Sequence, residues 1–418
     1  MRVSGRTAAI GLMTVVSVSI LAACSSSGSG GGGGSTTSGG SGTSASGSSG
    51  GAPVHIAILA PVSAPALAEA ASDQINAAKA AAAVVNKAGG VLGHQVVIDV
   101  LDEAGSATTA VTKLNSALSG GNKPVAVIQS DGSNITAAVI PITTQHKILS
   151  FNFAGTDTSI DPSKFPYNFD LAPSFDSFAA SFCPQLTALK AKTFGIIYTD
   201  DAFGDAEAPA IAAKCKAAGF TEAGSAKFPG TALDLTPQLS SIQSHKPDVL
   251  IASAYGAPAG YLLQGLNKLG WNVPVLGDAA VTGSAVITNS PPSGQLGTSL
   301  ETNLRTLLYA SEVSSDTSPE LTSLISGMEA LGPIKTNLGH ANAYDAVMLA
   351  VDGIKAAGST TDIAKVATAI QGLPAANQGT AVFPSYSFSA TSHAFNPAAS
   401  TFAFVRPTKL AHGQFQAS

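Results

Sequence analysis

The stretch between residues 125 and 157 constrains the fold most, because it alternates short apolar runs with a helical pattern. Val125–Ile128 and Ile148–Phe151 are predicted to be buried strands, and a helix is expected over about 134–145 between them. Two apolar strands joined by a helix are typical of a parallel βαβ unit. In open parallel sheets, ligands bind just beyond the carboxyl ends of the strands. We therefore expect the polar loops that follow these two strands to form one wall of a ligand site.

Ser133 stands in the first of these loops, where the helix begins, and serine is a favoured N-cap residue. A helix N-terminus also offers free N–H groups and partial positive charge to an anion. Two roles are compatible with this position: capping of the helix and binding of an anionic ligand group.

The alternation of strands and helices continues on both sides of this unit. The other expected strands are 55–59, 96–101, 194–198, 249–252 and 273–276, and the other expected helices include 72–87, 205–218, 258–269 and 341–357. Asp362 is predicted to cap one more helix, whereas residues 300–339 show no clear pattern. This order predicts an α/β protein with two similar domains, each a mostly parallel sheet flanked by helices.

The first residues read as a targeting segment. A basic start is followed by an apolar run over 8–20 and by the sequence Leu-Ala-Ala-Cys, which ends at Cys24 and resembles a bacterial lipobox. We expect 1–23 to be a lipoprotein signal peptide and Cys24 to carry the lipid, with 24–53 as a flexible Gly/Ser tether. The predicted location is extracytoplasmic, lipid-anchored to the bacterial cell membrane. An ordinary signal peptide with a chance cysteine is the alternative.

Composition and motifs narrow the class of protein further. Charged residues make up 11% of the chain and hydrophobic ones 45%, yet no later run is long enough to span a bilayer. The formal net charge is −5 and no basic cluster occurs, which argues against nucleic acid as a partner. The seven histidines are scattered, and no metal-ligand spacing, P-loop or nucleophile motif occurs in a suitable context. We therefore expect neither an enzyme nor a metal or other cofactor.

Cys183 and Cys215 fall in two predicted helices separated by one strand, so the helices can be neighbours. An exported protein is in a compartment that permits disulfides. We expect a bridge between them, with two small buried thiols as the alternative.

Four runs carry a family resemblance, in which the pattern Asn-x-x-Gly-Gly-x-x-Gly is the most specific part. They are IAILAPVSAP at 56–65, VNKAGGVLGHQV at 85–96, KILSFNFAGTD at 147–157 and IIYTDDAFGD at 196–205. Over residues 54–290 the chain resembles the leucine/isoleucine/valine-binding group of ABC-importer substrate-binding proteins, which are type I periplasmic binding proteins. The resemblance implies a two-lobed clamshell. Lobe 1 would hold 54–172 with 304–378, and lobe 2 would hold 173–303 with 379–418.

The resemblance also implies a set of ligand contacts. A ligand carboxylate would meet the hydroxyls of Ser133 and Thr156 and backbone N–H groups around Ala154 and Gly155. Hydroxyl and N–H donors suit an anion physically. Thr156 could instead satisfy its own loop as a turn residue.

The opposite lobe would contribute aromatic side chains, at Phe203 and Tyr255, although a role in the core is the alternative for both. The acid that meets the ligand's ammonium in the family falls at Ala279, and its neighbour Asp278 could serve after a small shift. Other candidate acids are Asp102, Asp131 and Asp201.

The implied function is capture of a small polar organic ligand by lobe closure and its delivery to the permease of an ABC importer. A branched-chain or other amino acid is the first choice of ligand, and a monomer is expected. The alternative is a ligand-sensing receptor for amides, urea-like compounds or small carboxylates that signals to a membrane partner. A purely structural surface lipoprotein is the remaining class.

Overall fold

The computed structural model describes residues 51–65, 67–129, 132–154, 159–314, 318–398 and 401–416, all within one unit of the chain. The expected signal peptide and residues 24–50 of the expected tether, with Cys24, lie outside the described residues, as do Gly155, Thr156 and Asp131. Residues 51–53, the end of the expected tether, belong instead to the first strand. Within the part that is described, no helix is long and apolar enough to cross a membrane.

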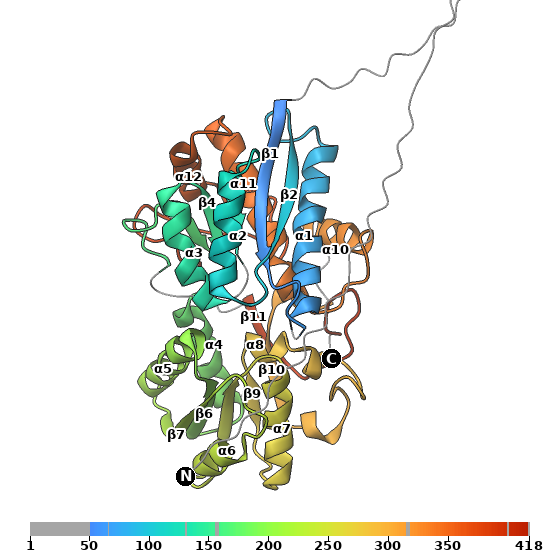
Figure 1. The fold of residues 1–418 in the computed structure, drawn as a ribbon. Helices are drawn as coiled ribbons and strands as arrows, with labels where there is room; N and C mark the ends of the chain where they lie inside the picture. Colours follow the sequence, from blue (N-terminus) through green and yellow to red (C-terminus); the bar gives the residue numbers. More distant parts are fainter. Residues whose placement is uncertain are drawn as a thin grey trace, which may run out of the picture. The chain divides into compact units, whose positions relative to one another are not determined.

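The first sheet contains five strands in the order β2-β1-β3-β4-β5, and every neighbouring pair is parallel (Figure 1). Its strands are β1 (Gly51–Ala60), β2 (His94–Asp102), β3 (Ala126–Ile128), β4 (Leu149–Asn152) and β5 (Asn168–Asp170). The connecting helices are α1 (Ala68–Lys87), α2 (Ala107–Ser119) and α3 (Ser133–Gln145). The βαβ unit predicted from sequence is confirmed, because β3 leads through α3 to β4 and the two strands pair directly.

Helix α1 ends at two glycines whose conformations other residues adopt only with strain. Gly89 and Gly90 have φ angles of +98° and +83°, in the left-handed region that favours glycine. A Cβ atom on Gly90 would also lie 2.1 Å from the carbonyl oxygen of His94. The pair therefore turns the chain sharply from α1 into β2.

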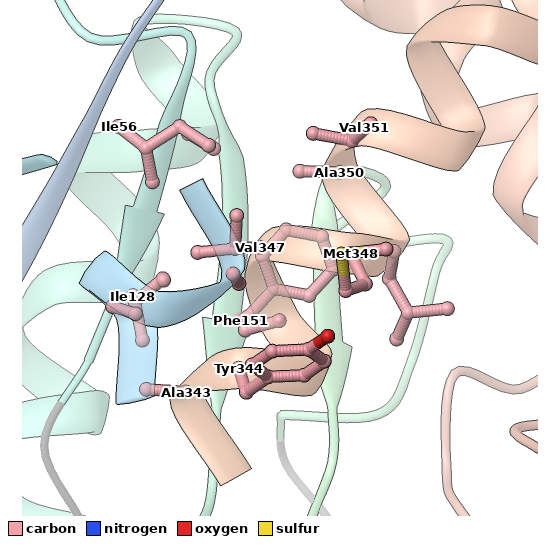
Figure 2. Close-up of a cluster of buried hydrophobic side chains, with 14 of the residues drawn as sticks. Ile56, Ile128, Phe151, Ala343, Tyr344, Val347, Met348, Ala350 and Val351 are labelled. Carbon is pink, nitrogen blue, oxygen red and sulfur yellow. The ribbon is translucent and has the colours of Figure 1, made fainter. Parts of the chain in front are cut away.

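Helices cover both faces of the first sheet. On one face, side chains of α2 and α3 pack against Ala57, Leu59 and Val127. On the other face, α1 and α11 (Ala343–Ala357) pack against Ile56, Ile58 and Ile128. Figure 2 shows how Tyr344, Val347 and Ala350 of α11 approach Ile128 and Phe151 of the strands. Two further helices, α10 (Pro319–Glu329) and α12 (Ile363–Gln371), contribute to the same core.

The second sheet has six strands in the order β11-β10-β9-β8-β6-β7, and all pairs are parallel except β10 with β11. Its strands are β6 (Thr193–Thr199), β7 (Thr221–Phe228), β8 (Val249–Ser253), β9 (Val275–Gly277), β10 (Leu304–Tyr309) and β11 (Phe402–Val405). Helices α4 (Phe175–Ala188) and α5 (Ala202–Ala217) cover one face, and α6 (Thr236–Gln243) and α7 (Ala257–Lys268) cover the other.

Short helical segments complete the fold. They are α8 (Ala279–Thr282), α9 (Ala285–Thr288) and the 3₁₀ turns η1 (Ser299–Glu301), η2 (Ala310–Glu312), η3 (Leu338–Asn342) and η4 (Ala375–Asn377). The helix expected over 341–357 begins as the 3₁₀ turn η3, so that α11 itself starts at Ala343. Asp362 caps α12 as predicted, because its side chain accepts a hydrogen bond from the backbone N–H of Lys365.

Two segments lie with a different sheet from the one that the family resemblance implied. Strand β10, within the stretch 304–378 assigned to lobe 1, pairs with β9 in the second sheet. Residues 381–395, within the stretch assigned to lobe 2, pack into the core beside the first sheet. Residues 381–383 are held there by the carboxylate of Asp345 in α11, which accepts hydrogen bonds from the backbone N–H groups of Ala381, Val382 and Phe383.

Helices α4 and α5 are joined by the predicted disulfide. Cys183 and Cys215 are bonded, with their Cα atoms 5.3 Å apart. Both are buried among apolar side chains of the second domain. An ion pair between Lys214 and Asp176 links the same two helices at the surface.

Candidate functional site

The residues predicted to bind a ligand follow the carboxyl ends of strands in both sheets. Ser133 and Ala154 follow β3 and β4 in the first sheet, whereas Phe203 and Tyr255 follow β6 and β8 in the second. Helices α3 and α5, which begin at these two places, have Cα atoms within 8 Å of one another.

Ser133 is the first residue of α3, and its N-cap is Gly132, so the prediction that Ser133 caps the helix is wrong. The helix starts one residue earlier than its pattern of side chains indicated. The Ser133 side chain is buried, and its hydroxyl donates a hydrogen bond of 3.5 Å to the carbonyl oxygen of Ala154. A long bond of this kind is easily exchanged for a bond to an anion. Ser133 thus connects the two loops that were expected to form one wall.

The loop after β4 is organised by Asn152. Its side-chain oxygen accepts a hydrogen bond of 3.1 Å from the backbone N–H of Ala154, a residue that is fully buried. The Ala154 N–H is therefore committed within its own loop. Gly155 and Thr156, the next expected contacts, lie outside the described residues.

Gln129, at the carboxyl end of β3, is a polar residue that the sequence analysis did not single out. It is fully buried, and its amide nitrogen donates a hydrogen bond of 2.6 Å to the Ser150 hydroxyl. Its amide oxygen has no hydrogen-bond partner among the described residues. Buried polar groups are normally paired. The signal available in the sequence was a glutamine directly after a buried strand.

The aromatic residues of the second sheet are held by two different contacts. Phe203, the second residue of α5, packs edge to face against Phe175 with ring centroids 5.5 Å apart. Tyr255 is 40% exposed, and its hydroxyl donates a hydrogen bond to the carboxylate of Asp201. Burial of part of the ring and the adjacent carboxylate both raise the pKa of the Tyr255 phenol above its ordinary value. Asp201, Phe203 and Tyr255 are called the second wall below.

Asp278 lies in the core rather than on this wall. The residue is fully buried at the N-terminus of α8, where it accepts hydrogen bonds from the Ser253 hydroxyl at 2.7 Å and the Val281 N–H at 2.8 Å. The carboxyl group of Glu207, from α5, lies against it and is equally buried. Burial raises the pKa of Asp278 to about 6. Burial and the neighbouring Asp278 raise the pKa of Glu207 well above its ordinary value.

Burial favours the neutral, protonated form of both carboxyl groups. Neither carboxyl oxygen of Glu207 has a hydrogen-bond partner among the described residues if both acids are ionised. A protonated Glu207 donates to Asp278, which explains how two acids can lie together in the core. Asp278 therefore serves as a capping and core group.

Other acids that the sequence analysis considered are engaged elsewhere. Asp102 accepts hydrogen bonds from the backbone N–H groups of Ser63 and Ala104 in the loop after β2. No cluster of side chains suited to a metal ion occurs among the described residues. Two surface hollows, one beside α11 and α12 and one near Asp99, include none of the candidate residues.

Comparison with known proteins identifies the family. The model of the family described as periplasmic binding protein matches residues 53–408. The chain belongs to this family. Members of the family are not enzymes, and this chain is an extracytoplasmic solute-binding protein of the ABC transporter type.

Two curated relatives cover most of the chain. One is the Leu/Ile/Val-binding protein homolog 3 of Brucella melitensis, 25% identical over 321 residues, which are 76% of this chain and 83% of the relative. The other is the Leu/Ile/Val-binding protein BraC3 of Rhizobium johnstonii, 27% identical over 326 residues, which are 77% and 84% of the two chains.

Solved structures share the fold. A periplasmic binding protein type 1 from Bordetella pertussis has a TM-score of 0.72 at 22% identity, over 84% of this chain and 96% of that one. A fatty acid ABC transporter substrate-binding protein from Thermomonospora curvata has a TM-score of 0.65 at 17% identity, over 77% and 80%. A solute-binding protein from R. palustris in complex with 4-hydroxybenzoate has a TM-score of 0.65 at 17% identity, over 76% and 85%.

Proposed function

We propose that the protein captures a small organic carboxylate between two parts of the molecule and delivers it to the permease of an ABC importer. One part is the connection from β3 to α3 that ends at Ser133, called the Ser133 loop, and the other is the second wall. The observation that carries the proposal is the placement of Ser133 and Ala154 after the strands of one sheet and of Phe203 and Tyr255 after the strands of the other. Ligands bind at such strand ends in open α/β sheets.

The ligand carboxylate is expected at the first sheet. Among the described residues, the Ser133 hydroxyl donates one hydrogen bond, of 3.5 Å to Ala154, so a carboxylate oxygen can take its hydrogen at little cost. The first N–H groups of α3 supply further donors and partial positive charge at the same place. Thr156 is expected to add a second hydroxyl.

The rest of the ligand is expected against the second wall. The rings of Phe203 and Tyr255 offer apolar surface, and closure of the two lobes would bury it. Closure turns occupancy into a shape that a permease can recognise. We expect Cys24 to anchor the protein to the membrane through its lipid.

An amino acid is the first ligand to test, because the curated relatives are Leu/Ile/Val-binding proteins. Carboxylates without an amine are the second class. The burial of Asp278 favours them, since the acid expected to meet an ammonium is bound to Ser253 and Val281 instead. The names of the fatty acid and 4-hydroxybenzoate proteins show that the fold accommodates such acids.

The test is a thermal-shift screen of amino acids, amides, fatty acids and aromatic carboxylates, followed by calorimetric titration of the ligands found. Ser133→Ala should weaken binding by roughly tenfold to hundredfold, because a hydrogen bond to a charged group contributes about 1.5–3 kcal/mol. Ser119→Ala is the matched control, since that exposed serine bonds only the carbonyl of Asn115 in α2. A change of less than threefold in Ser133→Ala would place the pocket elsewhere.

A further inference from the structure

The second wall contains a hydrogen bond whose direction is fixed by Asp201. One carboxylate oxygen of Asp201 accepts the backbone N–H of Gly204 at 2.9 Å and thereby caps α5. The other oxygen accepts the hydroxyl hydrogen of Tyr255. Each oxygen of the carboxylate thus has its own donor, one from the helix and one from the loop after β8.

This arrangement means that the Tyr255 hydroxyl can only accept a hydrogen bond from a ligand and cannot donate one. A phenol has a single hydrogen to donate, and here that hydrogen is directed at Asp201. The residue is 40% exposed, and a lone pair of its oxygen can still accept a hydrogen bond from another molecule. The raised pKa of the phenol keeps the hydrogen in place near neutral pH.

The position of the ring is also fixed from its backbone side. Gly256, the next residue, has a φ angle of +64°, in the left-handed region, and its N–H donates to the Ser284 hydroxyl at 2.8 Å. Strands β6 and β8 pair directly, so the loops that follow them lie side by side and bring Tyr255 near Asp201.

We infer that Asp201 sets the hydrogen-bond polarity of the second wall, so that the protein prefers carboxylates whose far end carries a hydrogen-bond donor. The inference rests on the proposed binding of a carboxylate between the Ser133 loop and the second wall. An acceptor at the far end of the ligand would face the Tyr255 oxygen without a hydrogen between them, which is unfavourable in a closed site.

The variant Asp201→Asn reverses the polarity with little change in shape. The asparagine oxygen can keep the bond to Gly204, because asparagine caps helices about as well as aspartate. Its amide nitrogen then donates to the Tyr255 oxygen, and the phenol hydrogen becomes free for a ligand acceptor. The protein should then prefer ligands that carry a hydrogen-bond acceptor, rather than a donor, at the end facing Tyr255.

The experiment compares two probes of similar size, 4-aminobenzoate with a donor at its far end and 4-acetylbenzoate with an acceptor. Calorimetric titration gives the ratio of the two dissociation constants for each form of the protein. We expect Asp201→Asn to move this ratio by about tenfold towards 4-acetylbenzoate. Tyr255→Phe, which lacks the hydroxyl, should show little preference. Comparing ratios between forms cancels the difference in size between the probes.

Asp200→Asn is the matched control. It removes the same charge one residue away, but Asp200 pairs with Lys227 at 2.7 Å and its carboxylate is not the acceptor of Tyr255. Its ratio should equal that of the unchanged protein. An equal change in both variants would mean that charge alone acts, which overturns the inference.

The outcomes separate this inference from the proposed function. If neither probe nor any other carboxylate binds the unchanged protein, the proposed function fails and the inference fails with it. If both probes bind and the ratio stays the same in Asp201→Asn, the proposed function stands and only the inference is overturned.

Discussion

Asp278→Asn should flatten the dependence of stability on pH. Asp278 is fully buried beside Glu207, and burial raises its pKa from 3.8 to about 6. The unfolded chain therefore releases this proton about two pH units earlier than the folded chain. Between those pH values the folded state binds more protons, so stability falls as the pH rises.

The magnitude follows from the same values. At about 1.4 kcal/mol per pKa unit, the rise from 3.8 to about 6 corresponds to about 3 kcal/mol of unfolding free energy, most of which is lost between about pH 4 and pH 7. Asparagine does not ionise and can keep the cap on Val281. Removing the Asp278 charge also lessens the repulsion that raises the pKa of Glu207, which acts in the same direction.

The assay is urea unfolding at a series of pH values from 4 to 8. We expect the unfolding free energy of Asp278→Asn, relative to the unchanged protein, to increase by about 2–3 kcal/mol across this range. Because only the change of this difference with pH is used, any pH-independent loss of stability caused by the substitution cancels. Parallel profiles for Asp278→Asn would refute the reasoning.

Three further predictions concern the disulfide, a buried carboxylate and the anchor. Replacing Cys183 and Cys215 together by serine should lower the unfolding free energy by roughly 3–4 kcal/mol in denaturant titrations, because the bridge closes a loop with a sequence separation of 32; an unchanged midpoint would contradict this. Asp345→Ala should cost more than about 3 kcal/mol in the same assay, since buried backbone N–H groups and the Tyr386 hydroxyl lose their acceptor, and a loss below 1 kcal/mol would argue against these bonds. The unchanged protein should carry a thioether-linked lipid by mass spectrometry, and Cys24→Ala should remain unprocessed; lipid-free unchanged protein in the culture fluid would count against the anchor.

Local patterns in the sequence were enough to predict most strands and helices. Short apolar runs separated by helical periodicity identified β3, α3 and β4, because burial on both faces of a parallel sheet requires such runs. The edge strand β7 escaped prediction, since its side chains are mostly exposed or half-buried and leave no apolar run. The disulfide was predictable because one strand between two helices places them side by side.

The tertiary structure alone decided which residues of the site face a ligand. Asp278 follows a strand just as Tyr255 does, yet Asp278 turns inwards because Ser253, Val281 and Glu207 surround it. Ser253 and Glu207 come from two other segments of the chain, so no local pattern contains them. The pairing of Tyr255 with Asp201 is also a contact between distant loops.

The same distinction applies to the assignment of segments to sheets. The sequence by itself determined that the chain would form two α/β domains, because periodicity and helix-ending residues act within a few positions. It did not determine that β10 joins the second sheet while residues 381–395 join the first core. The placement of residues 381–395 depends on the hydrogen bonds of Asp345 to backbone groups 36 or more residues away, which exist only once α11 is packed on its sheet. The placement of β10 depends on its pairing with β9, a strand from a separate part of the chain.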